Sequence, residues 1–187
     1  MKKTLLIGTF ITGSIFASLV YCSGSGEESG GITGWSKASR LDVAPVNNEL
    51  YRSECASCHF GYQPGLLPAR SWVKIMSGLE DHFGDNAELD PDSHARLLRY
   101  LVKNAADLSN YKRSRRITNS LSPDEAPLRI TDTLYFKRQH REISLTRVKN
   151  NPEIGSFSNC IACHSQADKG SFNEREIKIP GSRRGWN

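Results

Sequence analysis

The sequence predicts a mostly α-helical chain that folds as two small domains, and three observations support this class. Apolar residues recur at helical intervals of three and four along much of the chain. A motif of two cysteines and one histidine occurs twice, once toward each end. A basic stretch separates the two copies. We therefore expect an N-terminal domain at residues 45–110, a polar connector at residues 111–122 and a C-terminal domain at residues 123–187.

The repeated motif is Cys-x-x-Cys-His, the attachment signature of a c-type haem. Two thiols bond to the two vinyl groups of one porphyrin, and the adjacent imidazole binds the iron from one side. Two copies predict two covalently bound haem c groups. Haem 1 is assigned to Cys55, Cys58 and His59, and haem 2 to Cys160, Cys163 and His164.

Two other kinds of site use the same residue types. The four cysteines and two histidines could hold a structural zinc ion, or each cysteine pair could form a redox-active disulfide. Zinc sites usually bring cysteine pairs from nearby in the sequence, whereas Cys55 and Cys160 lie far apart in this chain. A thioredoxin-like site accompanies a βαβ pattern, which is not visible here. The sequence therefore favours haem.

Residues 1–21 have the pattern of an export signal. Lys2 and Lys3 precede an apolar stretch from Leu5 to Val20, which is too short and too rich in Gly, Ser and Thr for a membrane span. Covalent haem attachment outside the cytoplasm agrees with this interpretation. We therefore expect an exported, periplasmic protein.

Cys22 is the one cysteine outside the two motifs, so it requires an explanation of its own. With Leu19 three residues before it, Cys22 has the key residues of a lipobox, although Tyr21 is larger than the residue usual before the cut. Lipid anchoring through Cys22 and ordinary cleavage a few residues later both remain open. The following residues, up to residue 44, are expected to form a flexible Ser/Gly-rich tether.

The composition does not favour a nucleic-acid partner. The formal net charge is +5, two of these charges belong to the export signal, and haem propionates would roughly cancel the rest. Hydrophobic residues make up 37% of the chain, which is low for a globular protein. Two buried porphyrins would supply the missing apolar surface, so folding is expected to depend on haem attachment.

Three helices are predicted in the N-terminal domain, around the first haem motif. Asn48 can cap the N-terminus of the first helix. Ser71 can cap the second helix, which is expected to end at Gly84. The third helix is expected to begin at Asp90 and Pro91. Glycines and prolines between residues 60 and 70 predict a loop over the haem edge. The residues in helical phase are Leu50, Tyr51 and Cys55 in the first helix, Trp72, Ile75, Met76, Leu79, His82 and Phe83 in the second, and His94, Leu97, Leu98, Leu101 and Ala105 in the third.

One further helix is predicted in the C-terminal domain. Thr131 or Asp132 caps it, and it carries His140 toward its end. The residues around and after the second haem motif have few apolar positions, so we expect loops and short turns around haem 2. The basic residues 112–116 are predicted to be a solvated linker or a basic rim near a propionate or an acidic partner.

The sixth ligand of each iron decides between electron transfer and substrate binding. Met76 lies in the apolar phase of a helix, where a core role is favoured. His82, next to a helix-ending glycine, is assigned to haem 1, and His140 to haem 2. His94 is the competitor of His82; we favour for it a partly exposed role satisfied by water. A crossed pairing, with His140 on haem 1, also remains open.

These residues resemble the bacterial dihaem cytochrome c family, small exported cytochromes found paired with an oxygen-binding mono-haem c-type protein. The matching segments are Tyr51–His59, Pro64–Trp72, His82–Gly84, Phe136–His140 and Asn159–His164, within Tyr51–Phe172. The resemblance implies a two-domain electron carrier whose N-terminal domain is similar to a class I cytochrome c. It also implies bis-histidine ligation of both haems, with His82 and His140 as distal ligands, and a redox partnership with another haem protein or a membrane cytochrome.

We therefore predict a dihaem electron carrier between a quinol-linked donor and another haem protein, rather than an enzyme. Bis-histidine ligation predicts low reduction potentials. The alternative is a dihaem peroxidase or reductase with one open iron, in which Glu80 or Glu142 would act as the acid–base group. A third hypothesis is a haem module that senses or binds a small ligand. Partner identity and oligomeric state are not encoded in these motifs.

Overall fold

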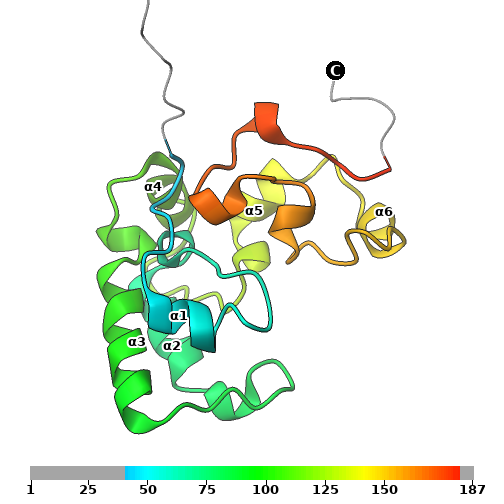
Figure 1. Cartoon of the computed structure of the whole chain (residues 1–187). Helices are drawn as coiled ribbons and strands as arrows, with labels where there is room; N and C mark the ends of the chain where they lie inside the picture. The colour runs from blue at the N-terminus through cyan, green and yellow to red at the C-terminus, as the bar shows by residue number, and fades with distance from the viewer. Residues whose placement is uncertain (1–40, 182–187) are drawn as a thin grey trace, which may run out of the picture. The chain divides into compact units, whose positions relative to one another are not determined.

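The structure is a computed structural model that describes residues 41–181 (Figure 1). The predicted export signal, Cys22 and nearly all of the predicted tether lie outside the described residues. Within residues 41–181, no helix has both the length and the apolar character that a membrane crossing requires.

The described residues form six α-helices joined by single 3-10 turns and loops, with no β-strand among them. This confirms the predicted mostly helical fold. The helices are α1 (Glu49–Glu54), α2 (Ala69–Met76), α3 (Pro91–Lys103), α4 (Lys112–Thr118), α5 (Leu134–Gln139) and α6 (Leu145–Lys149). The 3-10 turns lie at Pro64–Leu66, Leu79–Asp81, Ala106–Leu108, Ile130–Asp132, Cys160–Ala162, Ala167–Lys169 and Glu174–Glu176.

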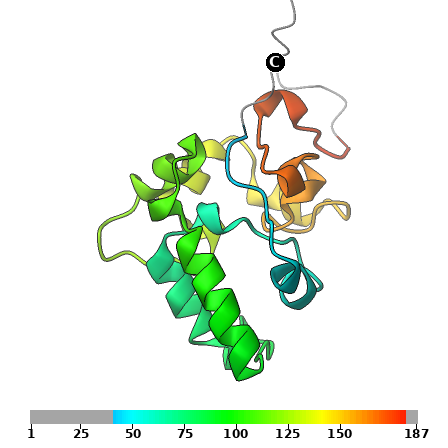
Figure 2. The same cartoon turned by 60° about the vertical axis from the view of Figure 1, so that its left-hand side comes forward.

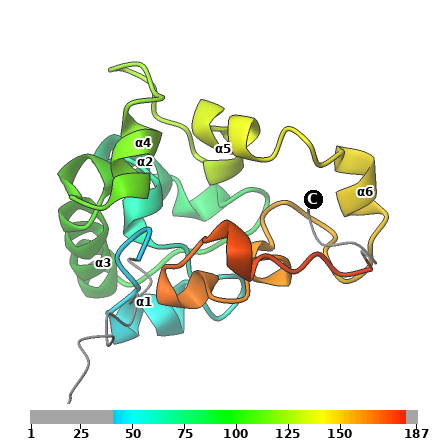
Figure 3. The same cartoon turned by 90° about the horizontal axis from the view of Figure 1, so that it is seen from above.

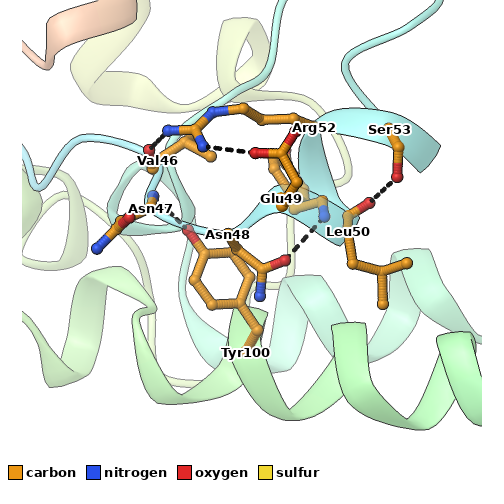
Figure 4. A network of polar contacts seen from close by, with 9 residues as sticks. Val46, Asn47, Asn48, Glu49, Leu50, Arg52, Ser53 and Tyr100 are labelled. Atoms are coloured by element: carbon orange, nitrogen blue, oxygen red, sulfur yellow. Dashed lines mark hydrogen bonds and ion pairs between the residues drawn. The ribbon is translucent and has the colours of Figure 1, made fainter.

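Helix α1 begins where the sequence predicts. The side chain of Asn48 accepts a hydrogen bond from the backbone N–H of Tyr51 (2.8 Å), which satisfies a donor that the first turn leaves free. The backbone N–H of Asn47 donates to the hydroxyl of Tyr100 on α3 (3.4 Å), and Arg52 pairs with Glu49 (Figure 4). These contacts fix the helix that leads into the first haem motif.

Helices α2 and α3 pack side by side and carry the main core of the protein (Figure 2). Asp90 caps α3 through its carboxylate, and Pro91 occupies the first helical position, as predicted. Trp72 is buried and donates its indole N–H to the carbonyl of Pro64 (2.8 Å), which holds the 64–66 turn against α2. The buried core cluster consists of Tyr51, Leu67, Trp72, Met76, Leu79, Leu97, Leu101 and Ala105.

The predicted second helix was too long, and its cap was wrong. Helix α2 begins after Pro68, so Ser71 lies inside the helix and is fully buried rather than capping it. The helix ends at Met76 because Ser77 and Gly78 break the backbone path, and a separate 3-10 turn follows. His82 therefore lies in a loop after this turn, not at the end of α2.

The basic residues 112–116, predicted to be a solvated linker or a basic rim near a propionate or an acidic partner, belong to helix α4. Only Ser114 and Ile117 of α4 are buried, so its apolar face is too narrow to give a clear helical pattern. Arg113 is also partly buried, where it pairs with Asp42 (3.1 Å). The stretch is therefore packed structure, although its first residues are basic.

The C-terminal part consists of two short helices, turns and loops. Thr133 caps α5 by accepting from the N–H of Phe136 (3.1 Å); the predicted caps, Thr131 and Asp132, instead lie in a 3-10 turn just before it. Helix α6, capped by Ser144, was not predicted. In Figure 3, α5 and α6 follow one another along the same side of the chain.

Segments from both ends of the described chain contact each other. The backbone N–H groups of Asp42 and Val43 both donate to the carbonyl of Gly170 (2.9 and 3.2 Å). Gly170 has a positive φ of 81°, and a Cβ there would collide with the carbonyl oxygen of Val43, so glycine is required. The side chain of Gln63 also donates a hydrogen bond to the backbone carbonyl of Ala167, in the C-terminal segment. The division into two domains stays a prediction.

Candidate haem sites

The first Cys-x-x-Cys-His motif follows directly from α1. Cys55 is the C-cap residue of the helix, and its N–H donates to the carbonyl of Tyr51 (3.0 Å). Cys55 packs partly buried against the core cluster, whereas Cys58 and His59 are exposed. The motif therefore has one cysteine anchored in the protein core and two residues that face outward.

A hydrogen bond to the backbone of the next residue orients the His59 ring. Its Nδ1–H donates to the carbonyl of Phe60 (2.8 Å), which leaves Nε2 free to bind a metal. The His82 ring lies 6.2 Å from the His59 ring, centre to centre, and the two planes are inclined by only 23°. The loop after α2 thus brings the predicted distal histidine opposite the proximal one.

The loop that carries His82 is a tight turn. The N–H of His82 donates to the carbonyl of Asp85 (2.7 Å), and Phe83 between them has a positive φ of 61°. Gly84 also has a positive φ, but it does not end α2 as predicted, because that helix already ends at Met76. The Phe83 ring meets the His82 ring edge-on at 4.8 Å, and the guanidinium of Arg129 lies 3.8 Å above the Phe83 ring centre. His82 is therefore held by a short stack of side chains.

The second motif lies in a 3-10 turn, Cys160–Ala162, followed by His164. The His164 ring lies 6.1 Å from the His140 ring, and here the planes are inclined by 77°. The N–H of Lys178 donates to the carbonyl of Cys163 (2.9 Å), so the C-terminal segment runs beside the motif. As at the first site, a distal histidine faces the histidine of the motif.

His140 is fixed at the end of α5. Its Nδ1–H donates to the carbonyl of Phe136 (3.0 Å), and its ring stacks on the Phe136 ring at 3.9 Å. The Phe157 ring packs edge-on against both rings. This arrangement leaves Nε2 of His140 free, as at His59.

Burial favours the neutral form of His82, His140 and His164, and the neutral imidazole is the form that binds a metal. Desolvation lowers the pKa of His164 to about 4, with help from the nearby His140 and Arg113 and against the effect of Asp42. Desolvation likewise lowers the pKa of His140, and of His82, where His59 and Arg129 add to the effect. Three of the four predicted iron ligands therefore remain unprotonated at neutral pH without any metal.

The spacing of both histidine pairs fits a haem iron between them. An imidazole nitrogen binds a transition metal at about 2 Å, so two imidazoles on opposite sides of one ion have ring centres about 6 Å apart. The measured 6.2 and 6.1 Å match this value. The second site also contains two buried nitrogen atoms, Nδ1 of His164 and Nε of Arg113, that lack a hydrogen-bond partner among the described residues.

The two alternative uses of the cysteines do not fit the structure. Residues 41–181 contain no group of three or more His, Cys, Asp or Glu side chains arranged to hold a bare metal ion, as structural zinc would need. Burial raises the pKa of both the Cys55 and Cys160 thiols to about 11, whereas a redox-active pair needs an easily formed thiolate.

His94 and Met76 serve the N-terminal core together. Nε2–H of His94 on α3 donates to the carbonyl of Met76 at the end of α2 (2.9 Å), so the partner is the helix end rather than the water expected from the sequence. Met76 itself is buried in the core cluster.

Several residues around the sites carried no recognisable sequence signal. Tyr62 lies 5.4 Å from the His59 ring, and its hydroxyl donates to the carbonyl of Ser158 (2.8 Å), close before the second motif. Arg129 is one basic residue among many, and only the folded chain shows its contact with Phe83 beside His82. The basic stretch 112–116 was noted in the sequence, but only the folded chain singles out Arg113.

Comparison with known proteins agrees with this geometry. The family model described as dihaem cytochrome c matches residues 51–172. A dihaem cytochrome c from Rhodobacter sphaeroides shares 42% identity with a TM-score of 0.62, covering 70% of this chain and 100% of that one. One from Shewanella baltica shares 42% identity with a TM-score of 0.58, covering 72% and 94%. A search of curated protein sequences gave no match.

Proposed function

Because this chain belongs to the dihaem cytochrome c family, we propose that it carries single electrons between a membrane or quinol-linked donor and another haem protein. The family binds two c-type haems, so the chain is an electron-transfer haem protein with two covalently attached haem c groups. We propose that His59 and His82 ligate haem 1 and that His164 and His140 ligate haem 2.

The observation that carries this proposal is the pair of facing imidazoles at each site. When bound, each haem supplies one reversible electron-transfer step at its iron. Two imidazoles face each other at each candidate site, at ring separations of 6.2 and 6.1 Å. If both rings of each pair bound the iron, no position would remain for a substrate on the metal, and the protein would transfer electrons only.

The enzyme and sensor alternatives need one open iron. The enzyme would also need an acid–base group beside that iron, and both Glu80 and Glu142 are exposed side chains. Glu142 lies 3.9 Å from the exposed Arg141. These positions give no support to a catalytic carboxylate, so the carrier is the better proposal.

Spectra of the holoprotein test the proposal directly. Oxidised, half-reduced and fully reduced protein should show two low-spin haems, and the reduced protein should not bind carbon monoxide at neutral pH. A high-spin signal in any of these states, or a carbon monoxide adduct, would contradict the carrier and favour the enzyme or sensor.

The ring orientations predict that the two haems differ in their EPR spectra. When the two imidazole planes are parallel, both rings raise the energy of the same iron d orbital, so its energy differs from that of the second orbital of this pair. When the planes are perpendicular, each ring raises one of the two orbitals, so their energies remain nearly equal. With planes inclined by 23° and 77°, haem 1 should give a rhombic low-spin spectrum and haem 2 a nearly axial one with a single large g value. Two identical rhombic spectra would show that the planes at the second site are not crossed.

The location remains a proposal as well. We propose that residues 1–21 direct export to the periplasm and that Cys22 is a lipidation site for membrane anchoring. Mass spectrometry of the purified mature N-terminus distinguishes a lipid-modified Cys22 from an unmodified cleaved end. The expected partners are other redox proteins rather than nucleic acid.

A further inference from the structure

Arg113 of α4 lies in a polar network at the edge of the second haem site. Its Nη1 donates to the hydroxyl of Tyr135 (2.8 Å), and its Nη2 donates to the carbonyl of Phe172 (3.1 Å). Nη2 also pairs with Oδ1 of Asp42 (3.1 Å), whose other oxygen accepts from the N–H of Phe172 (2.7 Å). Asp42 thus ties Arg113 and Phe172 together.

This network reaches the motif histidine through one aromatic ring. The guanidinium carbon of Arg113 lies 5.5 Å from the centre of the Phe172 ring, and that ring lies 5.4 Å from the His164 ring. About four fifths of the Arg113 side chain is removed from solvent, so its charge is weakly screened. A fixed positive charge therefore lies beside the second haem site.

Protein groups hold the guanidinium of Arg113 in place. Its Nη atoms contact Tyr135, Phe172 and Asp42, and Nε is buried without an acceptor within residues 41–181. The positive charge therefore has a fixed position beside the Phe172 ring.

We propose that the positive charge of Arg113 raises the reduction potential of haem 2. One-electron reduction lowers the charge at the iron by one, and a nearby positive charge stabilises the less positive, reduced state. Asp42 acts in the opposite direction because its negative charge partly offsets Arg113. The inference rests on the proposed binding of haem 2 at His164.

The test measures the potential of each haem in variants of the full holoprotein, with the haems identified by their EPR signals. R113M should lower the potential of haem 2 and leave that of haem 1 near its original value. R113K, which keeps the positive charge, should retain most of the original potential of haem 2. D42N should raise it, because the opposing charge is removed. R96M removes an exposed arginine paired with Asp92 and should move neither potential.

The opposite signs expected for R113M and D42N keep the proposal testable even if R113M folds poorly. An unchanged haem 2 potential in D42N, or an equal shift of both haems in R113M, would overturn the electrostatic role. Failure of the proposed ligation would appear separately, as a high-spin haem 2 in the unmutated protein.

Discussion

The H82A variant is expected to contain one high-spin haem that binds carbon monoxide and one unchanged low-spin haem. His82 is the only imidazole that the described structure places opposite His59, at 6.2 Å. Alanine cannot replace its nitrogen, so haem 1 loses its sixth ligand and gains an open position. H140A should produce the same change at haem 2, because His140 faces His164. Optical and EPR spectra with and without carbon monoxide measure both effects.

H94A is the matched control for these variants. His94 donates to the carbonyl of Met76, so its loss should cost about 1 kcal/mol of folding stability and leave both spectra unchanged. If H82A remained fully low-spin while H94A became high-spin, the assignment of His82 would be wrong and His94 would be the ligand. If H140A changed the haem 1 signal instead, the pairing would be crossed.

The helices that the sequence predicted well have strong local signals. Asp90 and Pro91 begin α3, and Asn48 begins α1, because a side-chain acceptor or a fixed φ acts on the first turn alone. The extent of α2 was wrong because Ser77 and Gly78 interrupt a pattern whose apolar phase continues into the next turn. These two local residues, which the apolar periodicity does not register, decided where that helix ends.

At the haem sites, features with a local sequence signal could be predicted and features that depend on tertiary contacts could not. The two Cys-x-x-Cys-His motifs were readable because their chemistry lies within five consecutive residues. The distal histidines were chosen largely by elimination, and the structure brings His82 and His140 opposite the motif histidines. The contact of Arg129 with Phe83 had no local signal, because the two residues are distant in sequence. The basic stretch 112–116 was visible in the sequence, but only its tertiary contacts single out Arg113.

Replacing Cys160 and Cys163 by serine should remove one covalent haem and unfold much of the C-terminal part. Among residues 123–181, only Val148, Ile154 and Ala167 are buried hydrophobic side chains. Aromatic rings around His140 and His164 are therefore expected to pack on the porphyrin rather than on a protein core. Intact mass should fall by one haem, and amide exchange between residues 134 and 172 should accelerate roughly a hundredfold or more.

The matching double substitution of Cys55 and Cys58 should also remove one haem, but with less effect on helical structure. Helices α2 and α3 share a buried cluster that includes Trp72, Leu97 and Leu101, so they have a core that needs no porphyrin. Amide protection in α3 should therefore persist in this variant. Equal loss of protection in the two variants would show that haem 1 is as necessary to its surroundings as haem 2. The difference between them measures how far each part of the chain depends on its cofactor to fold.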